Sequence, residues 1–582
     1  MSHGGSFGSG IRAGVGVLWF SALVACGGGG GGGAPGDAPP APSPAPVTAA
    51  PSPAPGDVGV SAADAARFLT QATSGPTSAD IARLSEIGYA AWIDAQLALP
   101  AKSHRAFVDA VAANGTALLP AHFRESWWTQ VITGDDQLRQ RVAFALSEIF
   151  VVSFADPALA ARPRGMAAYY DVLAAHAFGN YRDLLEAVAT HPMMGVYLSA
   201  LRNRKEDLAT GRQPDQNFAR EVMQLFSIGL HELNNDGTLK GGVATETYGT
   251  TDVEGLAKVF TGWSWYAGTN PADRTDRRFD GLDPHPEREW RPMQAYAKFH
   301  SASEKTFLGT TIPAGPSTAE ADMKVALDRL FAHPNVGPFF GRQMIQRLVT
   351  SNPSPAYVGR VASAFNDNGS GVRGDMKAVV RAVLLDPEAR SYQPSNTAFG
   401  KPREPVLRLA HFMRAFKARS ASGRYIGIDV SEVSSELHQQ PLNAPSVFNF
   451  FRPNYGPPNS AAAEAGLVAP EWQIADEVTL AHYVNYIRAW LVPLASRDVQ
   501  QDYTAELALA HDPGALVDRL NLLLMAGQMS TTHRQLIIGA VNGRNLPEPT
   551  DTNAAQVNAA RRDRVCIAIL LTMASPDYVV QK

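Results

Sequence analysis

The sequence predicts a mainly α-helical protein, built as one large multi-helix domain or as two packed helical lobes, with long loops and a few short strands. Apolar residues recur at three- and four-residue steps along most of the chain, which is the spacing of one helix face. Two long stretches rich in Gly, Pro and aromatic residues interrupt this pattern. The chain has 582 residues, more than one hydrophobic core usually serves.

The helical pattern is strongest in the middle and at the end of the chain. In residues 137–152, Leu138, Val142 and Leu146 follow each other at four-residue steps. Similar spacing predicts the other helices, which are expected over residues 218–229, from Pro338 onward, over 376–385 and 403–416, and from about Pro470 to a last helix over 564–573.

The loop-rich insertions fall within an expected helical domain over residues 61–582. They cover about residues 266–316 and 421–466. Loops of this length in a compact protein are usually functional or disordered. Their aromatic residues favour packed, ordered loops, and residues 299–312 are expected to supply short strands.

The N-terminus, residues 1–26, has the parts of a bacterial export signal. Arg12 precedes the apolar stretch Val15–Val24, which is far shorter than the roughly 20 residues of a membrane-spanning helix. Leu23-Val24-Ala25-Cys26 resembles the lipobox of bacterial lipoproteins, and this resemblance implies that the Cys26 thiol receives a diacylglyceryl group. An ordinary secretory signal with an incidental cysteine is the alternative.

Residues 27–60 are expected to form a flexible tether. Seven glycines come first, and a Pro/Ala-rich stretch follows that favours extended conformations. At about 3.1 Å per residue, that stretch would hold a domain up to roughly 70 Å from the lipid. By resemblance to sorted lipoproteins, Gly27 after the cysteine favours the outer membrane, on its periplasmic or surface face.

Composition and motifs exclude several classes of protein. The net charge is -4 and basic residues are not clustered, so we expect no nucleic-acid partner. Only Cys26 and Cys566 are present, and the apolar surroundings of Cys566 predict a buried thiol and no disulfide. His231 begins an HExxH-like pattern, but Asn235 replaces its second histidine, and residues 234–237 are better explained as a turn than as a calcium loop. No metal or cofactor is predicted.

The most informative polar pattern occupies residues 214–226, where Asp215 is expected to cap a helix. This helix carries a narrow polar stripe at i, i+3, i+4 and i+7, formed by Asn217, Arg220, Glu221 and Gln224. The stripe is either a solvated face or an inward-facing seam. A buried seam would have to be a hydrogen-bonded network, which holds helices together, or a binding or catalytic site.

A second cluster lies in residues 298–309. His300, Glu304 and Lys305 are residue types that perform acid–base chemistry, although a surface loop accounts for them as well. Four tryptophans also have two explanations: they line a carbohydrate or peptide cleft, or they belong to the hydrophobic core. The residues concerned are Trp127, Trp128, Trp263 and Trp265.

Short segments spread along the chain together resemble one family of exported bacterial proteins, catalogued as domain of unknown function 1800. They include KPREP at residues 401–405 and HPMMG at 191–195. The others are residues 66–69 with 72–77, 138–147, 217–229, 260–263, 305–309, 333–336, 444–448 and 469–471. The resemblance implies an exported, largely helical protein. Genes of the family commonly neighbour those of the exported family catalogued as domain of unknown function 1501, so a protein of that family is the expected partner. It implies no catalytic residue set.

Two functional hypotheses follow. The first is a lipid-anchored protein of the cell envelope that binds or scaffolds an exported partner or an envelope polymer. The second is an envelope hydrolase that uses Asn217, Arg220 and Glu221 together with His300 and Glu304. The hydrolase requires these side chains to meet in one pocket, within about 4–6 Å of one another. A structural alternative is that Glu221 pairs with a buried Arg220.

Overall fold

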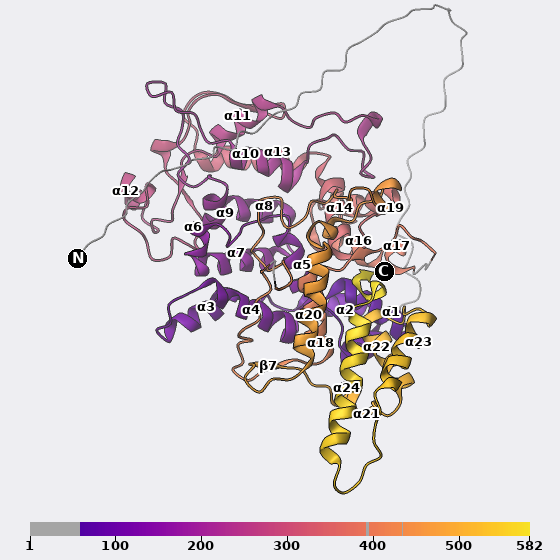
Figure 1. Cartoon of the computed structure of the whole chain (residues 1–582). Coiled ribbons are helices and arrows are strands. Elements are labelled where there is room, and N and C mark those ends of the chain that lie inside the picture. The colour runs from indigo at the N-terminus through magenta and orange to yellow at the C-terminus, as the bar shows by residue number, and fades with distance from the viewer. Residues whose placement is uncertain (1–58, 392–394, 433–434) are drawn as a thin grey trace, which may run out of the picture. The chain divides into compact units, whose positions relative to one another are not determined.

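The computed structural model describes residues 59–391, 395–432 and 435–582, which belong to the compact unit Ala54–Lys582. These residues contain 25 α-helices and four two-stranded antiparallel sheets (Figure 1), which confirms the predicted mainly α-helical fold. The export signal, Cys26 and nearly all of the tether lie outside the described residues.

The first helices begin at short polar residues. Ser61 accepts a hydrogen bond from the backbone of Asp64, and Thr77 forms a reciprocal capping box with Asp80. The elements are α1 (Ala62–Ala72), α2 (Ser78–Ala98), α3 (His104–Ala113), α4 (Pro120–Thr133), α5 (Gln137–Ser147), α6 (Pro157–Ala160), α7 (Pro163–His176), α8 (Tyr181–Thr190) and α9 (Pro192–Tyr197).

The middle of the chain is made of shorter pieces. They are α10 (Asn217–Glu221), the π-helix η1 (Val222–Ser227), η2 (Lys240–Gly242), α11 (Thr250–Val259), β1 (Trp263–Ser264), η3 (Pro271–Asp273), α12 (Asp276–Phe279), β2 (Gln294–Ala295), η4 (Ala297–Phe299), β3 (Lys305–Phe307), β4 (Thr310–Ile312) and α13 (Ala319–Ala332). β3 and β4 form a hairpin, so the strands expected within residues 299–312 are present.

Helices dominate again in the last part of the chain. The elements are α14 (Val336–Leu348), α15 (Pro355–Asn366), α16 (Met376–Leu385), α17 (Pro387–Arg390), β5 (Lys401–Pro402), α18 (Pro405–Ala415), β6 (Arg419–Ser420), α19 (Ala461–Glu464), η5 (Pro470–Ile474), α20 (Glu477–Leu491), β7 (Val499–Gln500), α21 (Thr504–Ala508), α22 (Pro513–Met525), α23 (Thr531–Gly543), α24 (Ala554–Met573), α25 (Pro576–Val579) and β8 (Val580–Gln581). The sheets β5–β8 and β6–β7 join segments far apart in the sequence.

Helix α5 lies inside the protein and positions the polar interior. All 11 of its residues are buried, and it packs against α2, α7 and α14. A helix that is buried on every side also buries its polar side chains, here Arg139, Gln140 and Arg141. Because buried polar groups need partners, α5 requires polar groups from its neighbours.

Three predicted helix boundaries are wrong. The helix predicted over residues 137–152 ends at Ser147. Further along the chain, Phe154 N–H donates to the carbonyl of Leu442, a partner in a distant loop instead of in the preceding turn. Helix α14 begins at Val336. Pro338 therefore lies in the first turn, where a helix has no N–H partner to lose. Helix α18 covers Pro405–Ala415 instead of residues 403–416, because the Pro ring suits a first helical position.

The predicted loop insertions are packed against the rest of the described chain. The rings of Phe279 and Phe299 stack with centroids 3.9 Å apart, and Phe451 is buried. The four tryptophans singled out in the sequence are also core residues, each at most 6% exposed: Trp127, Trp128, Trp263 and Trp265. Among the described helices, none has the length and apolar character needed to cross a membrane.

Candidate functional site

The polar stripe of α10 is divided between surface and interior. Asn217 and Arg220 are exposed, whereas Glu221 is buried and has one carboxylate oxygen without a hydrogen-bond partner. Burial raises the pKa of Glu221, and nearby Arg220 opposes that shift. The stripe is therefore neither a fully solvated face nor a closed seam. The structural alternative of a buried Arg220 is wrong, because the Arg220 side chain is in solvent.

The stripe ends where α10 changes into the π-helix η1. The hydroxyl of Ser227 donates to the carbonyl of Val222 at 2.5 Å, and Ile228 N–H donates to Met223 five residues back at 2.9 Å. The extra residue in this turn breaks the expected 3.6-residue spacing. Gln224 is consequently half-buried, and its side-chain oxygen accepts a 3.3 Å hydrogen bond from Tyr248. Single π-helical turns occur often at functional sites.

The start of α10 also differs from the prediction. Gln216 is the residue that precedes the helix, so Asp215 is not its cap. The Asp215 carboxylate instead accepts from Asn217 N–H at 2.8 Å, and the Asp215 backbone pairs with the side chain of Asn203. These contacts fix the chain before α10 and hold Asn217 at the surface.

His300 and Lys305 belong to a closed, buried network. His300 Nε2 lies 2.9 Å from Asp322 Oδ2, and its Nδ1 lies 2.9 Å from the carbonyl of Thr261. Lys305 Nζ lies 3.0 Å from the same Asp322 oxygen, to which Ser317 also donates. Although burial opposes it, hydrogen bonds from His300 and Lys305 lower the pKa of Asp322.

This network is ill-suited to a general base. Both ring nitrogens of His300 are engaged, one by the Asp322 carboxylate and the other by the carbonyl of Thr261, so neither is open to a substrate. Glu304 is exposed, and only its backbone carbonyl joins the surroundings, by accepting from Lys258 at 3.1 Å. The sequence-predicted cluster therefore separates into a buried pair, His300 and Lys305, and an outward-facing Glu304.

The stripe and the His300 network both border α11. That helix packs against α10 and also against β3, which carries Lys305. Among the residues that the structure describes, no hydrogen bond or ion pair joins Asn217, Arg220 or Glu221 to His300 or Glu304. Direct polar contacts that would support the hydrolase hypothesis are therefore absent between these groups in the part of the chain that the structure describes.

A third set of polar residues, not singled out in the sequence, lies at the end of α5. We call it the buried charge cluster, and each member is at most 4% exposed: Arg141, Glu148, Arg347, Lys401, Glu404 and Glu471. Lys401 is its centre. Its Nζ lies 2.9 Å from Glu471 Oε1 and 3.4 Å from Glu404 Oε1, and it donates to the carbonyl of Arg347 at 2.8 Å.

Glu148, directly after α5, is the unusual carboxyl of the cluster. Burial and then the adjacent Glu404 carboxylate raise the pKa of Glu148 to about 8, so it holds a proton at neutral pH. Burial also raises the pKa of Glu404, but Lys401 and Arg141 outweigh it and the net shift is downward. The two carboxyls thus share one negative charge.

The insertion at residues 421–466 completes this cluster. Gln439 donates to Glu404 at 2.7 Å, and Asn449 donates to Glu148 at 3.2 Å. These contacts give a physical reason why this long loop is ordered. They also bring segments together that carry the family resemblance, since Arg141, Lys401 and Glu471 come from three of them. Their position in these segments was the only feature of the sequence that pointed to the cluster.

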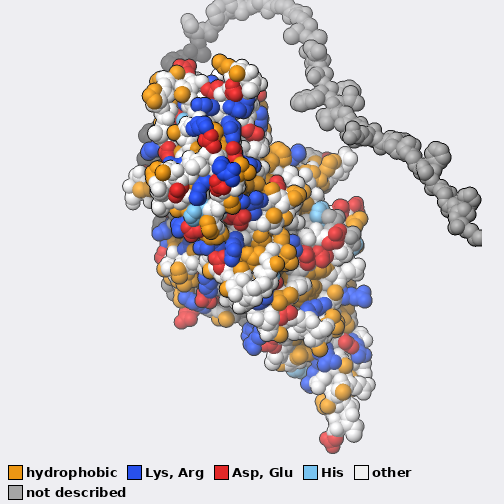
Figure 2. Space-filling view, turned by 90° about the vertical axis from the view of Figure 1, so that its left-hand side faces the viewer, with side chains coloured by type: hydrophobic (Ala, Val, Ile, Leu, Met, Phe, Trp, Pro, Cys, Tyr) orange, Lys and Arg blue, Asp and Glu red, His pale blue; other side chains and the backbone are white. Residues whose placement is uncertain are grey.

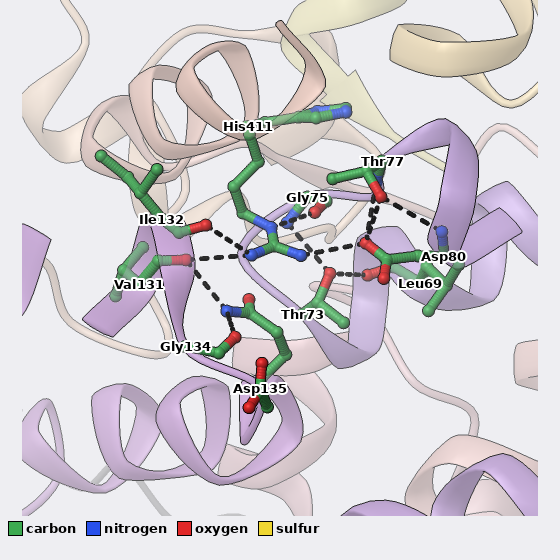
Figure 3. Close-up of polar contacts among 12 residues, drawn as sticks. Leu69, Thr73, Gly75, Thr77, Asp80, Val131, Ile132, Gly134, Asp135 and His411 are labelled. Atoms are coloured by element: carbon green, nitrogen blue, oxygen red, sulfur yellow. Dashed lines mark hydrogen bonds and ion pairs between the residues drawn. The ribbon is translucent and has the colours of Figure 1, made fainter. Parts of the chain in front are cut away.

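The loop between α1 and α2 closes one side of the cluster. In Figure 3 the carbonyls of Gly75, Val131 and Ile132 and the carboxylate of Asp80 surround one guanidinium, that of Arg414. Gly75 has φ +120°, and a Cβ there would lie 2.6 Å from the Cα of His411. The loop is therefore fixed closely against α18. Between it and the cluster lies a cavity of about 20 Å³, lined by Thr73, Ser74, Arg141, Lys401 and Arg403 among others.

Two smaller predictions concern Cys566 and the turn. Cys566 is half-buried instead of fully buried, and burial raises its pKa to about 11, so the thiol stays protonated. The turn at residues 234–237 is present: Gly237 N–H donates to the carbonyl of Asn234, and Gly237 has φ +77°.

The fold and these sites define a large, mainly helical protein whose buried ionic groups are held largely by one another. The chain belongs to the family of proteins of unknown function DUF1800, whose model matches residues 67–580. No curated protein and no solved structure matches the chain. The family membership expected from the sequence is thereby confirmed, and the lipid anchor at Cys26 stays a prediction.

Proposed function

We propose that this protein is an exported, lipid-anchored protein of the cell envelope that binds or scaffolds an exported partner or an envelope polymer. The lipobox at Cys26 and the long tether support the anchor, and Gly27 supports the outer membrane. The partner implied by the family resemblance is an exported protein of the family catalogued as domain of unknown function 1501.

One observation carries the choice of binding over hydrolysis. His300 and Lys305, two of the groups capable of acid–base chemistry, are engaged with Asp322 inside the protein. The polar groups of the stripe that remain accessible, Asn217 and Arg220, are suited to recognition. A binding surface on a rigid scaffold requires accessible polar groups on the outside and satisfied polar groups in the interior that supports them.

The surface next to the stripe has the composition of a protein interface. We call it the α10 surface, and it consists of Asn217, Arg220, Gln224, Leu230 and Tyr248. Leu230 is 50% exposed, and its carbonyl accepts from Thr247, next to Tyr248. Arg and Tyr side chains beside an exposed apolar group are enriched at interface hot spots. In the view of Figure 2, basic and acidic side chains are intermixed, so recognition by one broad field of a single sign is not favoured on that face.

The test is capture of partners by the full-length lipoprotein from envelope extracts. The double variant Arg220→Ala/Gln224→Ala is expected to lose a partner that wild type recovers. Its control is Arg83→Ala on α2, where the arginine is also exposed. Equal recovery by all three proteins, or no stable partner or polymer with wild type, would contradict the proposal.

The hydrolase alternative predicts a different outcome for His300. If His300 only holds α13 to the chain before β3 through Asp322, His300→Ala lowers stability and leaves partner capture intact at a temperature where the variant is folded. A purified protein that hydrolyses envelope polymer, and loses this activity without losing stability in His300→Ala, would favour the hydrolase.

A further inference from the structure

The buried charge cluster and its surroundings contain more positive than negative charge. Lys401 is matched by carboxylates at 2.9 Å and 3.4 Å, and Arg347 reaches Glu148 only at 3.8 Å. Arg141 and Arg403 also border this region, and neither makes an ion pair with any residue that the structure describes. Four cations therefore face three carboxyls, and the Glu148 carboxyl holds a proton at neutral pH. Uncompensated buried charge is costly, so a further anion would be favoured.

Arg141 and Arg403 also have unused hydrogen-bond donors. Arg141 Nη2 donates to the carbonyl of Arg347, whereas its Nε and Nη1 have no partner. Arg403 Nη1 contacts His411, and its Nε is unpartnered. Arg414, in contrast, uses Nε, Nη1 and Nη2 on carbonyls and on Asp80. Open nitrogens also occur on other arginines, such as Arg390, but Arg141 and Arg403 carry theirs on side chains that line the cavity.

The cavity has the size of a single small ion. Its volume of about 20 Å³ exceeds the roughly 10–15 Å³ that one water-sized sphere needs, so a monatomic anion fits. Besides the cations, Ser74 and Glu404 line it. The oxygens of Glu404 are occupied by Lys401 and Gln439. A metal ion is disfavoured because the free groups are cationic donors.

We propose that this cavity binds one small monovalent anion of chloride size, held by the free N–H groups of Arg141 with Lys401 and Arg403 nearby. The anion balances the excess positive charge and supplies an acceptor to donors that have none. It ties α5 to the segment 401–403 and to the loop that carries Ser74. The site is separate from the α10 surface, so it stands whether or not that surface binds a partner.

The first test compares thermal unfolding of the full-length protein in sodium chloride and in sodium gluconate at equal ionic strength. The Tm is expected to be higher in chloride and to rise by about 1 °C for each tenfold increase above the Kd. Arg141→Gln should lose this chloride dependence. Arg139→Gln is the matched control: it removes another buried arginine of α5 that does not line the cavity, so its Tm falls, but the chloride dependence remains.

A second test uses the unchanged protein, so that a failure of Arg141→Gln to fold does not matter. Crystals soaked in bromide are expected to give an anomalous peak within about 3.5 Å of Arg141 Nε or Nη1. Equal Tm values in chloride and gluconate, a chloride effect that persists in Arg141→Gln, or bromide found only elsewhere would overturn the proposal. Each of these results would leave a water molecule as the occupant.

Discussion

At the residue scale, the stability of the interior depends on buried charged side chains whose ionic partners are other members of the same cluster. Lys401 neutralises Glu404 and Glu471 at once, and all three are at most 2% exposed. Such groups add little net stability as a set, but losing one member leaves its partner charged and unpaired away from water. The stability of this protein should therefore respond more to single changes here than to changes at the surface.

Replacing the central lysine tests this directly. Lys401→Met is expected to lower the free energy of unfolding by about 3–5 kcal/mol, because two buried carboxylates lose their cation. The matched control is Lys298→Met, since Lys298 is paired with Asp276 but its side chain is 67% exposed. The control should change stability by at most about 0.5 kcal/mol. Urea denaturation measures both, and similar losses in the two variants would count against the cluster.

The proton on Glu148 makes stability depend on pH. The folded-state pKa, about 8, is above the ordinary value of a glutamate, so the folded protein binds the extra proton more tightly. This contribution is full at acidic pH and is lost as the pH rises toward 8. Glu148→Gln imitates the protonated form and removes this dependence.

As the pH rises from about 5 to about 8, the stability of the variant relative to wild type is thus expected to increase by up to about 1 kcal/mol per pH unit. Above about pH 8 the difference should stay constant. Urea denaturation at several pH values measures the difference. A difference between Glu148→Gln and wild type that stays constant over this range would show that Glu148 titrates normally.

At the element scale, amphipathic helices could be predicted and irregular ones could not. The spacing of Val379, Val380 and Val383 places α16 correctly, because one apolar face is enough to define a helix. The π-helix η1 depends on Ser227 bonding to Val222 and on Tyr181, from α8, bonding to the carbonyl of Phe226. The second of these contacts comes from a distant segment, which local periodicity does not reveal.

The loop between α1 and α2 gives the element-scale prediction. In Gly75→Ala the new methyl group would meet the backbone of His411, so the loop must move away from α18, and we expect a loss of about 3 kcal/mol or more. Gly115→Ala is the control. Gly115 also has positive φ (+75°), but it has open space around it, so backbone strain alone should cost about 1 kcal/mol. Equal losses of stability would mean that α18 does not constrain the loop.

At the scale of the whole molecule, the candidate site was harder to predict than the fold. The composition and periodicity of the chain were sufficient for the helical class. The buried charge cluster unites residues from α5, β5 and η5, and a single sequence does not reveal which distant charges meet. The stripe was found because its residues are neighbours on one helix, but its burial depends on α11 and Tyr248.

The prediction at the scale of the whole molecule concerns the lipid anchor at Cys26. Cys26→Ser should move the protein from the detergent phase to the aqueous phase in Triton X-114 partitioning of cell envelopes, because the lipid is the proposed membrane attachment. Cys566→Ser is a control with the same chemical change at a half-buried thiol, and it should partition like wild type. Detergent-phase partitioning of Cys26→Ser would contradict lipidation at this residue.

The central claim, that the α10 surface binds an envelope partner, is tested most directly by site-specific photo-crosslinking in intact cells. A photoreactive residue at the exposed Asn217 is expected to give a discrete crosslinked product, and the same residue at Arg83 is expected to give none. Absence of any product at Asn217, or the same products at both positions, would contradict the claim.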